Sequence, residues 1–146
     1  MAKIEDFEEY QLKQHLVSGG FYQPFTDIFG NDQPAPVSQV NLFNSADVRV
    51  EGKRFIFIKP VGPALNPTTQ LYSNERNMLI SVVGLPNISD DTIVKGYATD
   101  INNYLINNPS DGKCIYNIIQ SRLNGPFLDS DSRVIYEINL TVMFQV

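Results

Sequence analysis

The side chains that could do chemistry in this sequence are few and lie far apart. His15 is the only histidine, and its acidic neighbours in IEDFEEYQLKQHL favour a surface or boundary position over the role of a general base. Cys114 is the only cysteine, so it cannot close a disulfide within the chain, and its strand-like surroundings predict a buried, unreactive thiol. Neither covalent catalysis nor a zinc site is predicted, because no base accompanies a nucleophile and no cysteine–histidine cluster exists.

Paired aspartates are the other candidates, since two carboxylates can bind a cation or act as acid and base. Asp90 and Asp91 suit the positive end of a helix. Residues 129–133, DSDSR, begin like a calcium loop, but the glycine at its sixth position and the glutamate at its twelfth are missing. We interpret this stretch as a tight turn before a strand. No catalytic residue, metal site or cofactor is predicted, and we do not expect an enzyme.

Composition narrows the class of protein. The chain has 146 residues, enough for one domain, and a net charge of -5, from 11 basic and 16 acidic residues. The basic residues form no run, so tight binding to nucleic acid is not expected. The charged start, MAKIEDFEEYQLKQ, is unlike a signal peptide, and no stretch approaches the roughly 18 apolar residues of a membrane span. We expect a soluble protein made inside a cell.

Two amphipathic helices are predicted, over residues 4–16 and 89–108. In the second helix, Ser89 is expected to be the N-cap, and apolar residues recur at a spacing that builds one broad face for packing on a sheet. Gly96 costs up to about 1 kcal/mol relative to alanine, so we expect it to permit a close approach to the sheet or to a neighbour.

Connecting segments of unusual composition lie between the predicted elements. Residues 17–39 are rich in aromatics and prolines and predict a structured connector with a helical turn near Asp27. After it, two strand-like runs suggest a strand pair with a turn near Gly52. Residues 60–76 then predict a long loop, which we interpret as a contact arm rather than a tether because of its apolar residues. Those residues are Val61, Leu65, Leu71 and Tyr72.

The end of the sequence carries the clearest strand signal. KCIYNIIQ predicts one strand, Asn124-Gly125-Pro126 a turn, and residues 133–146 a last strand with strict alternation of its apolar face. A strand of that length spans about 45–50 Å, so we expect it to bend or to overhang its own sheet and pair with another copy. The predicted fold is a single α+β domain, with a mostly antiparallel, twisted sheet of about five strands and two main helices packed on it.

The order of an N-terminal helix followed by four stretches resembles the tail terminator, or neck terminator, family of long-tailed bacteriophages. The four stretches are GNDQPAP, the interruption between FIFIKP and NMLISVVG, the helix DDTIVKGYATDINNYLINN, and NGPFLDSDSRVIYEINLTVMFQV, which together cover about residues 27–146. The resemblance implies a structural virion protein, made in the host cytoplasm, that forms a ring of six at the end of the tail tube. That ring would stop tube growth and join the tail to a head connector or stopper protein, and DNA would pass an acidic lumen without specific binding.

The resemblance also implies where contacts lie, because the loop over residues 60–76 would reach a neighbouring subunit, the tube or the head. Arg133 would form an intersubunit ion pair, although a solvated arginine at the start of a strand is the simpler interpretation. The candidate subunit or tube contacts are Val61, Leu65, Leu71, Tyr72, Arg133, Met143 and Gln145. The alternatives are a head-completion, connector or baseplate component and, from a different class, a small-ligand domain. Its pocket would be formed by Tyr97, Tyr104, Tyr116 and Tyr136.

Overall fold

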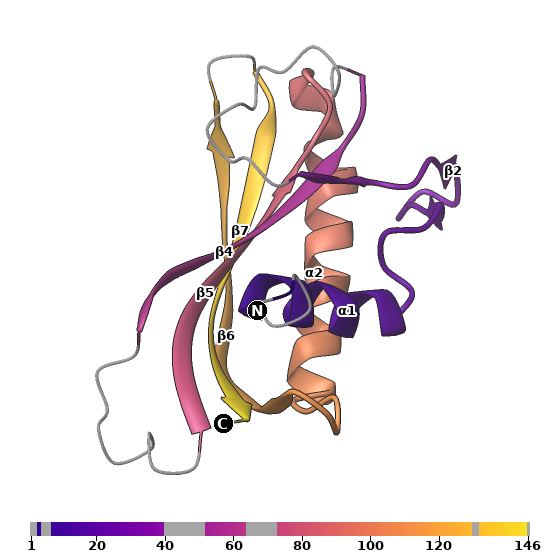
Figure 1. Cartoon of the computed structure of the whole chain (residues 1–146). Helices are drawn as coiled ribbons and strands as arrows, with labels where there is room; N and C mark the ends of the chain where they lie inside the picture. Colours follow the sequence, from indigo (N-terminus) through magenta and orange to yellow (C-terminus); the bar gives the residue numbers. More distant parts are fainter. Residues whose placement is uncertain (1–2, 4–6, 40–51, 64–72, 130–131, 146) are drawn as a thin grey trace.

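The computed structural model in Figure 1 describes residues 3, 7–39, 52–63, 73–129 and 132–145. The helices are α1 (Glu8–Ser18), the short 3-10 helix η4 (Ile88–Asp90) and α2 (Asp91–Asn107). The strands are β1 (Phe25–Thr26), β2 (Asp32–Gln33), β3 (Val37–Gln39), β4 (Phe55–Pro63), β5 (Ser73–Val83), β6 (Ile115–Leu128) and β7 (Val134–Gln145).

The main sheet has five strands in the order β3-β4-β5-β7-β6, and α1 and α2 pack on one of its faces (Figure 1). The pairs β4–β5, β5–β7 and β7–β6 are antiparallel, whereas β3 runs parallel to β4. The α+β class is therefore confirmed, although the sheet is mixed rather than purely antiparallel. The separate pair β1–β2 is antiparallel and lies on the helix side of the molecule.

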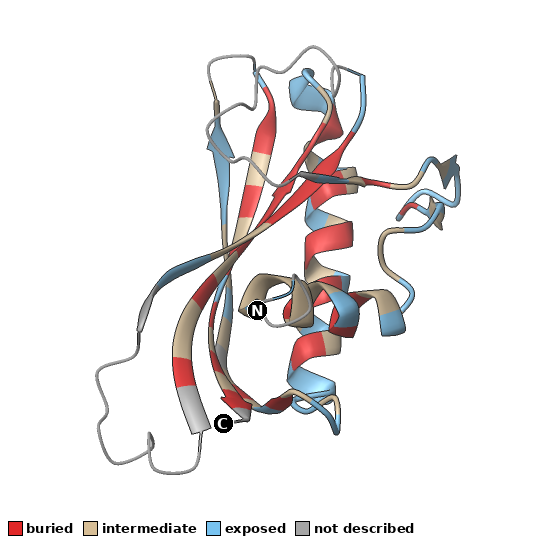
Figure 2. Cartoon of the chain, viewed as in Figure 1, coloured by how far each residue is buried: buried red, intermediate tan, exposed pale blue. Residues whose placement is uncertain are grey.

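The core lies between the sheet and the two helices (Figure 2). Alternation along β7 turns Val134, Tyr136, Ile138, Leu140, Val142 and Phe144 toward α2, and all six are buried. The broad face of α2 meets them with Val94, Tyr97, Ala98, Ile101 and Leu105. Burying one large aliphatic side chain contributes about 1.5–3 kcal/mol, so this interface accounts for the helix-on-sheet arrangement.

Strand β7 does not overhang the sheet, which corrects the expectation of an unpaired end. It is an inner strand, paired with β5 from Ser73↔Gln145 to Val83↔Ile135 and with β6 along its other side. Both neighbours run along almost all of β7: β5 has 11 residues against its 12, and β6 has 14 because it does not end near Gln120. It continues through the predicted turn at residues 124–126 by means of register shifts, so β6, not β7, forms the edge of the sheet.

His15 is buried, with 3% of its surface exposed, so the prediction of a surface or boundary position is wrong. Its Nε2 atom lies 2.7 Å from the carbonyl oxygen of Asn108, just after α2, and its ring lies 5.1 Å from that of Tyr104. The hydroxyl of Tyr104 donates to the carbonyl of His15. The histidine therefore joins α1 to the end of α2, a contact between segments that no local pattern reveals.

The second helix, α2, starts at Asp91, two residues after the predicted start, and a short 3-10 helix precedes it. The side-chain cap belongs to that 3-10 helix, η4, where Asn87 accepts the N–H of Ser89 at 3.0 Å. Ser89 is therefore inside this short helix rather than at its N-cap. The helix α2 follows directly and ends at Asn107, one residue before the predicted end.

The connector contains strands instead of the predicted helical turn. Asp27 lies in the turn between β1 and β2, where its N–H donates to the carbonyl oxygen of Asn31 at 2.8 Å. The predicted loop over residues 60–76 is shorter, because β4 extends to Pro63 and β5 begins at Ser73. Residues 40–51, the first half of the predicted strand pair, and residues 64–72 lie outside the described part of the chain.

Candidate interaction surfaces

The face of the sheet opposite the helices carries polar side chains from four strands. Near its centre is a recess of about 340 Å³ whose lining includes Val61, Asn77, Arg122, Asn139 and Thr141. The hydroxyl of Thr141 donates to Oδ1 of Asn77 at 3.0 Å, and Val61 is 48% exposed on the rim. The recess is thus an amide-lined hollow with an exposed apolar residue and one cation.

Charge on this helix-free face is balanced among the described residues. By strand alternation the face carries Lys59 and Arg122 as bases and Glu75 and Glu137 as acids. The uncharged polar residues Asn77, Asn117, Asn124, Asn139 and Thr141 lie between them. The net charge of -5 therefore does not come from this face.

The predicted contact residues separate into three groups. Val61 and Met143 are placed on the helix-free face, with Met143 opposite Glu75 on β5. Gln145 is the last residue of β7 and pairs with Ser73. Leu65, Leu71 and Tyr72 lie outside the described residues.

Arg133 is buried, with 2% of its surface exposed, so it is not the solvated arginine that the sequence suggested. Its Nη1 donates to the carbonyl oxygens of Lys53 at 3.1 Å and Gly84 at 2.8 Å. The guanidinium also lies 5.3 Å from the centre of the Phe55 ring, in cation–π geometry. Arg133 therefore joins the start of β7 to the segments next to β4 and β5 within its own chain.

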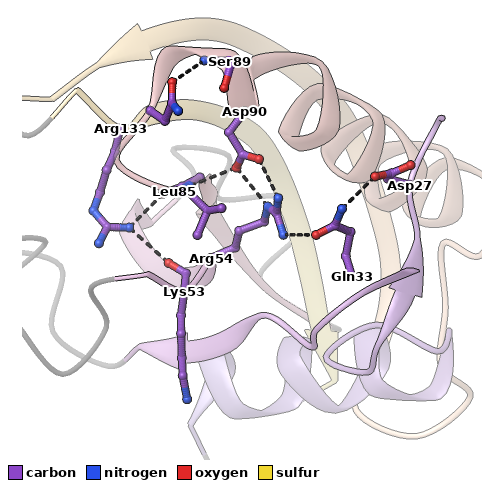
Figure 3. Close-up of polar contacts among 10 residues, drawn as sticks. Asp27, Gln33, Lys53, Arg54, Leu85, Ser89, Asp90 and Arg133 are labelled. Atoms are coloured by element: carbon purple, nitrogen blue, oxygen red, sulfur yellow. Dashed lines mark hydrogen bonds and ion pairs between the residues drawn. The ribbon is translucent and has the colours of Figure 1, made fainter. Parts of the chain in front are cut away.

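A buried polar network, shown in Figure 3, begins at the ion pair between Arg54 and Asp90. The guanidinium meets both carboxylate oxygens, and Nε lies 2.9 Å from Oδ2, which also accepts the N–H of Leu85. Arg54 further donates to Oε1 of Gln33, whose amide donates to Asp27 at 2.8 Å. The sequence pattern indicates only a helix start at Asp90 and gives no signal for Arg54 or Gln33, because no local pattern predicts a pair 36 residues apart.

The network holds what we call the arm, residues 21–36, which extends past α2 on the side away from the sheet (Figure 1). At its base, Phe21 packs edge-on against Tyr97 and Tyr104, and the Phe25 ring lies 4.5 Å from that of Tyr97. Tyr22 has φ of 67°, a left-handed conformation that is uncommon outside glycine, and its N–H donates to the Tyr97 hydroxyl. These contacts fix the direction in which the arm leaves the body.

The tip of the arm is also ordered by hydrogen bonds. Oδ1 of Asp27 accepts the N–H groups of Phe29 at 2.8 Å and Asn31 at 3.0 Å, and Oδ2 accepts from Gln33. The bond from Asn31, more than any other cause, lowers the pKa of Asp27 below its usual value. At this turn Ile28 and Phe29 stay 68% and 66% exposed, so a rigid turn presents two large apolar side chains to the outside.

The tyrosines considered for a ligand pocket have separate roles. Tyr97 and Tyr104 bind the arm and α1 through their hydroxyls, while Tyr116 is 59% exposed on β6. The Tyr136 hydroxyl donates to Asp91 at 2.7 Å, and burial, followed by that acceptor and its charge, raises the pKa of Tyr136 to about 12. Three of the four hydroxyls are thus used inside the chain.

A metal site, a reactive thiol or a membrane span would each need particular residues within the described ranges. The residues in those ranges contain no group of three or more His, Cys, Asp or Glu side chains placed to hold a metal ion. Cys114 lies just before β6 rather than inside a strand and is partly exposed, which corrects its predicted burial. Within the same ranges no helix is long and apolar enough to cross a membrane.

Comparison with known proteins gave one match. The model of a protein family described as phage tail termination protein matches residues 37–146. The matched span begins at β3, so it contains the five-stranded sheet and α2 and leaves α1 and the arm outside. No curated protein and no solved structure matched the chain significantly.

Proposed function

Because the chain belongs to the phage tail termination protein family, we propose that it forms a ring of six copies at the end of a phage tail tube. The ring stops growth of the tube and joins the tail to the head, so the protein acts in the neck of the virion. The observation that carries this proposal is the family match over residues 37–146, which contain the whole main sheet and α2.

The two faces of the sheet support a structural role. One face is filled by α1 and α2, whereas the other carries a smaller buried cluster of Phe55, Phe57 and Val83 and, beside it, polar groups and the recess at Val61. Such a layered subunit can place its free face or its edges against neighbours without disturbing its core. We propose that the partners are further copies of this chain, the tail tube protein and a head connector or stopper protein.

Passage of DNA through the ring is compatible with a subunit whose basic residues are not clustered. The basic residues form no run in the sequence, and on the helix-free face Lys59 and Arg122 are offset by Glu75 and Glu137. Tight binding to phosphates requires clustered cations, which release counterions from the DNA. We therefore propose that DNA slides through the ring without specific contacts.

Electron microscopy of the purified protein, alone and mixed with growing tail tubes, tests the function. We expect rings in the first sample and tubes of limited length with density at one end in the second. Tubes that lengthen as fast with the protein as without it contradict the proposal. A label on the protein in whole virions distinguishes the neck from a head-completion site or the baseplate, because each lies at a different place.

A further inference from the structure

The arm presents an apolar tip that the subunit itself does not cover. Ile28 and Phe29 are neighbours in the turn and both are exposed. The turn that carries them is ordered by a hydrogen bond to Asp27, and Gly30 adopts the left-handed backbone conformation there, with φ of +84°. Ordering a flexible loop on binding costs free energy, and a turn that is already ordered avoids most of that cost. The tip is thus pre-organised for insertion into a partner.

The charge of the arm indicates which kind of surface its tip can bind. Residues 21–36 contain the two acids Asp27 and Asp32 and no lysine or arginine, although Lys95 of α2 lines the groove between Ile28 and that helix. Asp32 is exposed beside the tip, where its only partner among the described residues is the Thr26 hydroxyl at 3.3 Å. A matching surface therefore combines apolar contact with a cation.

The recess on the helix-free face has these properties. Val61 supplies an exposed apolar rim, and Arg122 is exposed and is the one charged side chain among the described residues of the lining. Its volume of about 340 Å³ lies at the lower end of the range for small-molecule pockets, about 300–1,000 Å³, which is enough for a large side chain.

Tip and recess lie on opposite sides of the molecule. The arm leaves the helix layer, whereas Val61 and Arg122 belong to the face that the helices do not cover (Figure 1). A closed ring is built from head-to-tail contacts, in which one surface of each copy meets a different surface of the next. A projecting tip and a recess placed on opposite sides are a suitable pair for such a contact.

We propose that the tip of the arm of one copy inserts into the recess of the next copy in the ring. Ile28 and Phe29 pack at Val61, and Asp32 faces Arg122. This inference rests on the proposed ring and adds the contact that closes it. The arm precedes the segment matched by the family, so this contact is an addition made by residues 21–36.

Charge exchange tests the pairing. We expect Asp32→Arg and Arg122→Asp each to weaken ring formation by about tenfold or more, because close charge pairs at interfaces couple strongly. The double variant should recover most of the loss. Lys113→Asp is the matched control, since Lys113 is also exposed but lies in the loop before β6. Ring formation is measured by analytical ultracentrifugation over a range of protein concentrations.

Crosslinking tests the geometry directly. In a Cys114→Ser background, Phe29→Cys combined with Val61→Cys should give ladders of covalent oligomers with a short bismaleimide reagent, and neither single variant should. Ile28→Ser with Phe29→Ser should reduce ring formation while leaving the melting temperature of the subunit unchanged, because both side chains are exposed.

Several results overturn the inference. The first is full ring formation by Asp32→Arg and by the double variant Ile28→Ser with Phe29→Ser. The second is the absence of crosslinking in rings that do form. The third is that the double serine variant forms normal rings that no longer attach to tubes. The last result assigns the tip to the tube protein. Failure of the function is distinguishable, since wild-type rings that crosslink but do not stop tube growth overturn only the proposed role. If the wild type forms no ring, both are overturned.

Discussion

Arg54 and Asp90 form a buried ion pair that joins the residue before β4 to the residue before α2. Their side chains are only 5% and 4% exposed, and two guanidinium nitrogens meet two carboxylate oxygens. The same pair supports the arm through Gln33 and orders the turn at Leu85 through a backbone N–H. A single polar contact therefore positions the sheet, the main helix and the arm relative to one another.

Breaking this pair should destabilise the whole subunit. Asp90→Ala leaves the guanidinium of Arg54 buried without its counter-charge, and losses of this type cost about 3–5 kcal/mol. Urea denaturation measures the change in the free energy of unfolding. Asp100→Ala is the control, because Asp100 is an exposed acid of α2 and its removal should stay within about 0.5 kcal/mol. Equal effects of the two variants would contradict the importance of the pair.

Gly84 has no room for a side chain. A Cβ atom there would lie 2.6 Å from Cγ2 of Val94 and 2.7 Å from Oδ2 of Asp90, the oxygen that binds Arg54. Gly84→Ala should therefore push the start of α2 away from the sheet and cost about 1–3 kcal/mol, as overpacking does. A lowered midpoint of urea denaturation tests this expectation, and an unchanged midpoint would show that the helix shifts freely.

Gly96 should behave in the opposite way. The sequence predicted that this glycine allows a close approach to the sheet or to a neighbour, but among the described residues a Cβ atom there would come within 4 Å of Ile28 alone, at an ordinary 3.8 Å. Gly96→Ala should stabilise the subunit by up to about 1 kcal/mol, because alanine has the higher helix propensity. Thermal denaturation compares the melting temperatures of the two glycine variants. A loss of stability in Gly96→Ala would mean that the arm lies closer to α2 than described.

The sequence was informative where one periodicity dominates a long segment. The alternation from Val134 to Phe144 correctly identified the buried face of β7, and the helical spacing from Ile93 to Leu105 located α2 to within two residues. In both cases burial against the other layer enforces the pattern, so residue type and position carry the same information.

Features that depend on distant partners were not predictable in this way. The extension of β6 through Gly125 needs register shifts against β7, and the burial of His15 depends on Asn108. Arg54 can be explained locally as a charged residue at a strand end, and Asp90 as a residue at a helix start. Neither local explanation indicates that the two form an ion pair. Local propensity is a weak guide wherever tertiary contacts decide the outcome.

The order of the arm should depend on pH through Asp27. Hydrogen bonds, chiefly that from Asn31, hold the pKa of this carboxyl below its unfolded value of about 3.9. The stabilisation is therefore fully present above that value and is lost as the pH falls through the lower, folded pKa. The protection of the Phe29 and Asn31 amides against hydrogen exchange, measured relative to their intrinsic rates at each pH, should fall below about pH 4. In Asp27→Asn, which keeps an acceptor oxygen but does not titrate, this fall should be absent.

Removing the last four residues, MFQV, should damage folding and, with it, assembly. Phe144 is 3% exposed and packs in the core, and residues 143–145 pair with the start of β5 on one side while residues 143–144 pair with that of β6 on the other. Loss of a buried phenylalanine alone costs about 3–5 kcal/mol, a large part of the roughly 5–15 kcal/mol that stabilises a typical domain.

Two further variants separate the contributions to this effect. Phe144→Ala in the full-length chain should reproduce most of the loss, because the buried ring supplies most of the stabilisation in this segment. Deleting only residues 145 and 146 removes the Ser73↔Gln145 pair and leaves Phe144 in place, so its cost should be much smaller. Urea denaturation gives the stability of each variant, and analytical ultracentrifugation gives its oligomeric state. A four-residue truncation that folds and assembles like the wild type would show that the end of β7 is dispensable.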